Sequence, residues 1–139
     1  MSRSGYTDKM DDNWELIKWR GQLASAIRGK RGQRLLREML AALDAMPEKA
    51  LVAHELETQE GDVCALGALG KARGIDMQRL DPEEPEDVAA AFDVAPQLAR
   101  EIVYFNDEVG EHGETCEQRW KRMREWVARR IITEDEPCK

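Results

Sequence analysis

The stretch DNWELIKWRGQLASAIRGKRGQRLLREMLAALDAM, residues 12–46, decides the fold because apolar residues recur along it at helical spacing. The apolar positions of its first half are Leu16, Trp19, Leu23 and Ile27. Those of its second half are Leu35, Leu36, Met39, Leu40, Leu43 and Met46. The glycines of the RGKRG segment at 28–32 interrupt the pattern, and Pro47 ends it. The sequence therefore predicts one helix over 12–28 and a second from about Gly32 to Met46, paired as a helical hairpin.

Residues 50–74 are less regular. The segment ALVAHELE fits either a short strand or a helical turn, and TQEGD after it is a turn. Asp62 is then placed to cap a helix through CALGALGKA, which Gly74 ends. One short β-hairpin near 50–63 therefore stays open as an alternative to helix in this region.

The second half of the chain predicts three more helices. Apolar spacing after the acidic connector DPEEPED favours helices over 88–92 and 96–109. Thr115 and Gln118 then have the spacing of a capping box and open a last helix. The inner face of that helix is expected to hold Trp120, Met123, Val127 and Ile131.

Length and composition fit a single compact, mainly α domain of five to six helices. The chain has 139 residues, of which 42% are hydrophobic and 35% charged, enough for one modest core. We expect the domain to span 12–132, between a flexible segment at 1–11 and a flexible tail at 133–139. The residues expected to be largely buried are Trp19, Leu36, Leu40, Phe92, Ile102, Phe105, Trp120 and Val127.

The same numbers favour a cytoplasmic protein. No segment approaches the roughly 18 apolar residues of a membrane span, and the N-terminal MSRSGYTDKMDD lacks the apolar run of a secretory signal. Three cysteines without paired spacing favour reduced thiols. The net charge of −7 and the isoelectric point near 5.0 argue against general coating of nucleic acid, although not against a local basic patch.

Charge is sorted into blocks along the chain. Residues 14–37 hold seven basic side chains against one acidic, a net charge of +6. Residues 74–118 hold two basic against thirteen acidic, a net charge of −11, and residues 119–130 hold six against one, a net charge of +5. Such blocks concern partners and association rather than fold.

The first basic block is densest where the second helix begins. Its cations there are Arg28, Lys30, Arg31, Arg34 and Arg37. Free backbone N–H groups and the positive end of the helix dipole favour anions, so this basic turn is a candidate site for phosphate or RNA. The alternative, which we favour from sequence, is that these side chains pair with the acidic segments 81–87 or 107–117.

The acidic block offers a candidate surface for a basic protein partner. The residues of that surface are Glu83, Glu84, Glu86, Asp87, Asp107 and Glu108. Tyr104 lies off the apolar stripe of the helix at 96–109 and is the expected aromatic anchor of an interface. The alternative is a solvated surface that only favours solubility.

Residues 86–102, EDVAAAFDVAPQLAREI, have the rhythm of a helix-turn-helix, with Asp93 at the turn position that Gly usually fills. The second helix offers Gln97 and Arg100 for contacts with DNA. Acidic residues follow along the same helix, and they repel phosphates. We therefore expect a structural helix pair here rather than a DNA reader.

Cys64 is a candidate nucleophile, because the first turn of a helix favours a thiolate. Its base would be His54 or His112, oriented by Asn106 or Asp107. The small residues around Cys64 favour packing instead. A structural zinc site normally shows two tight ligand pairs, which are missing from the available set of His54, Cys64, His112 and Cys116. We expect neither a metal nor a cofactor.

Three landmarks carry a resemblance to a known group. They are the segment GDVCALGALGKARG, the pair Asn106-Asp107 after an apolar helix, and the closing RWKRMREWV. Together with WELIKWRGQLASAIRGKRGQRLLREMLAALDAMPEK they resemble small proteins of phages and prophages, over about residues 4–132. The resemblance carries no activity, and it implies a phage or mobile-element setting.

The function expected from these observations is binding rather than catalysis. We expect a non-enzymatic phage-type accessory protein that binds and modulates or inhibits a host or phage protein through the acidic surface. The partner would carry a basic surface and could belong to nucleic-acid-handling or defence machinery; no membrane partner is expected. The first alternative is a nucleic-acid-binding protein that uses the basic turn or a degenerate helix-turn-helix at 86–102. The second alternative is a thiol enzyme that depends on Cys64.

Overall fold

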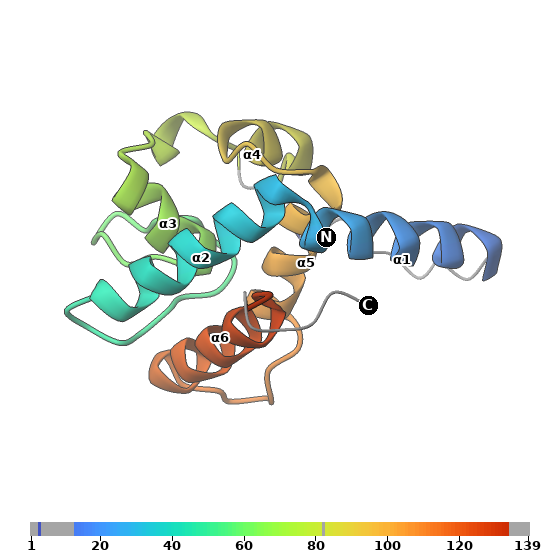
Figure 1. The fold of residues 1–139 in the computed structure, drawn as a ribbon. Coiled ribbons are helices and arrows are strands. Elements are labelled where there is room, and N and C mark those ends of the chain that lie inside the picture. The colour runs from blue at the N-terminus through green and yellow to red at the C-terminus, as the bar shows by residue number, and fades with distance from the viewer. Residues whose placement is uncertain (1–2, 4–12, 82, 134–139) are drawn as a thin grey trace.

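The computed structural model describes residue 3, residues 13–81 and residues 83–133. The α-helices of these ranges are α1 (Asn13–Arg28), α2 (Lys30–Ala45), α3 (Ala65–Arg73), α4 (Pro85–Ala91), α5 (Pro96–Asp107) and α6 (Cys116–Arg130) (Figure 1). A short 3-10 helix, η1 (Met77–Arg79), follows α3, and no strand occurs in these ranges. The mainly α fold class is therefore confirmed. Apart from Arg3 and Thr133, the segments expected to be flexible lie outside the described residues.

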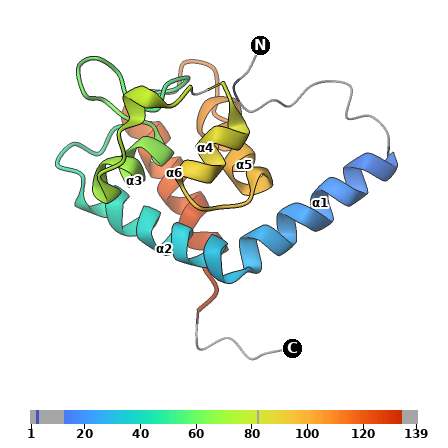
Figure 2. The same ribbon diagram turned by 90° about the horizontal axis from the view of Figure 1, so that it is seen from above.

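α1 and α2 form where the apolar spacing predicts helices, but they do not pair as a hairpin. Only Gly29 separates them, so α2 begins before Gly32. The backbone at Gly32 packs tightly on the end of α1, since a Cβ there would lie 1.9 Å from the carbonyl oxygen of Ala26. Figure 2 shows the two helices diverging from this junction in an open V. One arm of the V, α2, belongs to the core, while α1 extends away from it.

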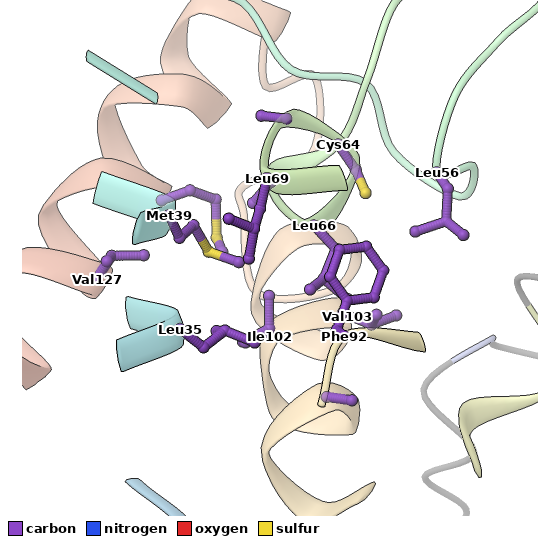
Figure 3. Close-up of a cluster of buried hydrophobic side chains, with 14 of the residues drawn as sticks. Leu35, Met39, Leu56, Cys64, Leu66, Leu69, Phe92, Ile102, Val103 and Val127 are labelled. Atoms are coloured by element: carbon purple, nitrogen blue, oxygen red, sulfur yellow. The ribbon is translucent and has the colours of Figure 1, made fainter. Parts of the chain in front are cut away.

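The core lies between α2, α3, α5 and α6, and α4 packs on α5 at one side. Figure 3 shows aliphatic and aromatic side chains from these helices meeting in one cluster. Its largest fully buried members are Phe92, Leu35, Leu36, Met39, Leu43, Leu51, Leu66, Leu69, Leu98, Ile102, Met123 and Val127. Burying one such side chain contributes roughly 1.5–3 kcal/mol, so this cluster is the main source of stability.

Four of the eight residues expected in the core are fully buried, and the other four are partly buried at its edge. The fully buried ones are Leu36, Phe92, Ile102 and Val127. The half-buried ones are Trp19, Leu40, Phe105 and Trp120. The three aromatic rings lie at the rim, where cations can cover them: Arg100 lies over Trp19, Arg130 over Phe105 and Lys49 over Trp120.

The segment between α2 and α3 holds neither the strand nor the helical turn considered for it. A single antiparallel bridge between Glu57 and Val63 is all that forms of the expected hairpin among the described residues. Cys64, rather than Asp62, caps α3, because its Sγ accepts a hydrogen bond from the backbone N–H of Gly67 at 3.4 Å. The expected cap at Asp62 is therefore wrong.

The last three helices form close to their expected ranges. Pro85 and Pro96 occupy the first turns of α4 and α5, where a missing N–H costs nothing. The capping box of α6 is confirmed in both directions. The backbone N–H of Gln118 donates to Thr115 Oγ1 at 3.1 Å, and the backbone N–H of Thr115 donates to Gln118 Oε1 at 2.8 Å.

Candidate functional site

Four exposed carboxylates gather where α4 begins. Glu83 and Glu84 precede the helix, and Glu86 and Asp87 lie in its first turn. Negative charge is favourable there because it faces the positive end of the helix dipole. Within the described part of the chain, none of the four forms an ion pair. We call these four residues the acidic corner.

The other three residues expected on the acidic surface lie differently. Glu108 is exposed. The side chain of Asp107 is only 2% exposed and binds the Arg3 guanidinium through contacts of 2.6 and 2.8 Å, so the expectation that it faces a partner is wrong. Tyr104 is half-buried, and its ring meets that of Phe105 edge-on at 5.8 Å. It therefore does not project as an isolated anchor.

Asn106 and Asp107 instead form a polar hub inside the molecule. Asn106 Oδ1 accepts from the backbone N–H of Ala65 at 3.2 Å, at the start of α3. Its Nδ2 donates to the carbonyl oxygen of Val52 at 3.0 Å and to Asp107 Oδ1 at 2.8 Å. The end of α5 is thereby tied to α3, to the loop before it and to Arg3. This buried network fixes one arrangement of these segments, although Arg3 Nη1 is buried without a hydrogen-bond partner among the described residues.

The electrostatics of the hub keep Asp107 ionised. Burial alone raises the pKa of a carboxyl group, but hydrogen bonds and charge from Arg3 outweigh it. Asn106 and the backbone N–H of His54, which lies 3.1 Å from Asp107 Oδ1, act in the same direction. The pKa of Asp107 therefore lies below its ordinary value.

Cys64 is buried beside this hub. Its residue exposure is 1%, and its sulfur caps α3. The imidazole of His54 is 75% exposed, and its Nδ1 lies 3.8 Å from Asp107 Oδ2, too far for a hydrogen bond. No group of three or more metal-ligating side chains comes together among the residues that the structure describes.

The two basic blocks meet at one place, although 81 residues lie between them in the sequence. Gln33 joins them. Its Nε2 donates to the carbonyl oxygens of Ile27 at 2.7 Å and Arg130 at 3.0 Å, and its Oε1 accepts from the N–H of Ile132 at 2.8 Å. Figure 2 shows the end of α6 beside the α1–α2 junction. The exposed cations gathered there, which we call the basic junction, are Arg28, Lys30, Arg31, Arg34, Arg37 and Arg129.

Within the described residues, few of these cations are neutralised. Arg31 lies 3.3 Å from Asp93, with both side chains well exposed, and Arg37 donates to the carbonyl oxygen of Ile132 at 2.9 Å. Arg129 pairs with Glu125 one turn away on α6. Among the described residues, none of the basic-junction cations pairs with 81–87 or 107–117, so the pairing favoured from sequence is wrong. Within the described chain, the acidic corner and the basic junction are both exposed and do not pair with each other.

The segment 86–102 forms two helices joined by a turn, as a helix-turn-helix does. The two side chains that would contact DNA, however, are engaged by α1. Asp93 adopts a left-handed conformation with φ of 53° at the turn. Gln97 Nε2 donates to Gln22 Oε1 on α1 at 3.1 Å. The guanidinium of Arg100 lies over the ring of Trp19, also on α1, at 5.8 Å. Both side chains that would read DNA therefore contact α1 within the molecule.

Part of the acidic block is neutralised inside the molecule by α6. Glu114 has a side chain only 8% exposed and pairs with Arg122 at 2.6 Å and with Arg119 at 3.4 Å. Hydrogen bonds from Arg122 lower the pKa of Glu114, and burial opposes them only in part. Arg119 also donates to the carbonyl oxygen of Asn106 at 3.0 Å. These charges hold the loop before α6 and are not part of a binding surface.

Sequence reasoning missed Arg3 and Gln33, the two residues that join distant segments. Nothing in the sequence marks Arg3. Gln33 carries one weak signal, since it lies three residues before Leu36 on the buried face of α2, where a polar side chain needs a partner.

Comparison with known proteins gives no family for the chain: no family model, curated protein or solved structure matches it. Among the described residues, no helix is long and apolar enough to cross a bilayer.

Proposed function

We propose that this chain is a non-enzymatic, phage-type accessory protein of the cytoplasm that binds a host or phage protein through the acidic corner. Binding would modulate or inhibit the partner. The partner would present a basic surface, as proteins that handle nucleic acid do, because they must neutralise phosphates. The acidic corner, together with the exposed Glu108, supplies the complementary field.

The observation that supports this proposal is that the acidic corner is both exposed and unpaired within the described chain. The helix dipole favours acidic residues at this helix start, and their exposed oxygens stay accessible to an oppositely charged protein. Grouped charges of one sign steer an oppositely charged protein and raise its rate of association. The proposal therefore predicts binding that weakens as salt rises.

The test is a pull-down from host-cell lysate followed by affinity measurements on the captured partner. The variant changes Glu83, Glu84, Glu86 and Asp87 to Lys. We expect it to bind the partner at least about tenfold more weakly than the native chain, because opposite fields become like fields.

The matched control changes the same amount of charge elsewhere, at the exposed residues Glu55, Glu60, Glu111 and Glu117. We expect it to retain most of the native affinity. Native affinity in the acidic-corner variant, or an equal loss in both variants, would overturn the proposal.

A second candidate function rests on the basic junction, because the fold brings cations from α2 and α6 together there. Phosphate contacts supply most non-specific affinity for nucleic acid, and such affinity falls steeply with salt. The test is fluorescence anisotropy with single-stranded RNA and duplex DNA, using Lys30, Arg31 and Arg34 changed to Glu. Under the acidic-corner proposal we expect weak or absent binding at physiological salt. Tight, salt-sensitive binding that this variant abolishes would favour the second function.

A further inference from the structure

An apolar groove of about 560 Å³ lies between the C-terminal end of α2, the loop after it, the turn at 61–63 and α3. Its volume lies in the range of ligand and side-chain pockets. Small and aliphatic side chains dominate its lining, among them Ala42, Ala45, Met46, Val63, Ala68 and Ala72. A floor of alanines leaves room for a bulky apolar side chain, and it lets a helix backbone approach closely.

The rim of the groove carries negative charge. Glu48 and Asp62 line it and are exposed. The one cation in the lining, Lys71, is engaged within the molecule. Its ammonium donates to the carbonyl oxygen of Gly61 at 2.5 Å and pairs with Glu57 at 3.3 Å. The groove therefore suits an apolar group that is flanked by cations.

α1 offers an apolar group of this kind. Ile17 is 62% exposed, more than any other large hydrophobic side chain in the described residues. Trp19 and Gln22 contact α5, whereas Ile17 and Gly21 line an open hollow of α1 beside Ala95. Lys18 and Arg20 are exposed beside Ile17. Figures 1 and 2 both show α1 projecting away from the other helices.

α1 does not reach the groove of its own chain. α2 has 16 residues, a length of about 24 Å at 1.5 Å per residue, and the groove lies at its far end. Both views place α1 and α3 at opposite ends of the molecule. An occupant with the chemistry of α1 must therefore come from another molecule.

We propose that the occupant is α1 of a second copy of this chain. Ile17 would enter the alanine-lined groove, Gly21 would allow close approach, and Lys18 and Arg20 would face Glu48 and Asp62. The contact is heterologous, since it joins two different surfaces. It does not rest on the function proposed above, because the groove and the acidic corner share no residue.

The experiment is sedimentation velocity of the full chain across a dilution series that reaches about 100 μM. The native chain is expected to associate with rising concentration and to dissociate as salt rises. Ile17→Asp and Ala72→Trp are each expected to weaken association at least about tenfold. Both positions are exposed, so we expect the two substituted chains to fold. Circular dichroism and thermal melting check this.

The matched controls are Val109→Asp and Ala90→Trp. Both change exposed residues outside the two surfaces, and both variants should associate like the native chain.

Mixing the two variants makes the test specific. Ile17→Asp keeps an intact groove and Ala72→Trp keeps an intact helix, so together they can form one native contact. We expect association to return in the mixture, with one copy of each variant in the complex. A native chain that stays monomeric throughout the series would overturn the proposal. Single variants that associate like the native chain would also overturn it. So would a mixture of the two variants that fails to associate although the native chain does.

Discussion

Asp107 ends α5 with a buried carboxylate that three neighbours hold in its charged form. They are the Arg3 guanidinium, the Asn106 amide and the backbone N–H of His54. From sequence this residue looked like part of an acidic surface, because charge runs say nothing about which side chain turns inward. The partner that draws it inward, Arg3, lies 104 residues away. Contacts at this separation leave no local pattern, so residue-scale predictions failed here.

Arg3→Met should destabilise the protein strongly at neutral pH. It leaves Asp107 buried without its cation, and breaking such a pair typically costs about 3–5 kcal/mol. Because the folded pKa of Asp107 is lowered, the pair stabilises above the ordinary carboxyl pKa of about 3.9, and that contribution is lost as pH falls through the folded value. Urea unfolding measures the free energy of unfolding of the variant and of the native chain. The difference between them should be smaller at pH 3 than at pH 7.

The control is Arg79→Met, which breaks an exposed pair with Asp76 and should cost less than about 1 kcal/mol in the free energy of unfolding. Equal costs at the two sites would contradict the buried pair.

Cys64 should react slowly with iodoacetamide in the native protein. It is buried and caps α3, whereas Cys116 is exposed and serves as an internal reference. Peptide mass spectrometry at neutral pH should find Cys116 labelled at least about a hundredfold faster, because alkylation needs an accessible thiolate. Rapid labelling of Cys64 that His54→Ala slows would instead support a thiol enzyme.

At the scale of elements, local patterns predicted where helices form. They did not predict how α1 and α2 are arranged or which residue caps α3. The 3.6-residue spacing placed α1 and α2, and the Thr115–Gln118 box placed the start of α6. These signals lie within one helix, so sequence contains them. The open angle between α1 and α2 depends on backbone contact at Gly32, and the cap of α3 depends on a cysteine, a residue type outside the usual capping set.

Gly32→Ala should destabilise the α1–α2 junction. The added Cβ would lie 1.9 Å from the carbonyl oxygen of Ala26, so the backbone must shift, at a cost of about 1–3 kcal/mol. Gly21→Ala is the matched control, because its Cβ meets nothing within 4 Å and it should gain up to about 1 kcal/mol in helix propensity. Thermal melting of the two variants should therefore shift in opposite directions. Parallel shifts would show that close packing at Gly32 does not fix the junction.

At the scale of the whole molecule, the sequence revealed the sorting of charge but not its layout. The order of charged residues along the chain identifies the +6, −11 and +5 blocks. Only the fold shows that Glu114 pairs with Arg122 of α6. It also shows that the end of α6 meets the start of α2 through Gln33. The result is a chain with an acidic corner and a basic junction that do not pair with each other. This separation of charge supports binding as the function.

Hydrogen–deuterium exchange on the complex with the captured partner tests the acidic corner most directly. Exchange of backbone amides reports which segments become protected on binding. We predict slower exchange over residues 83–92 in the complex, with residues 28–37 unchanged. Protection confined to 28–37, with 83–92 exchanging as in the free protein, would contradict the proposed acidic interface.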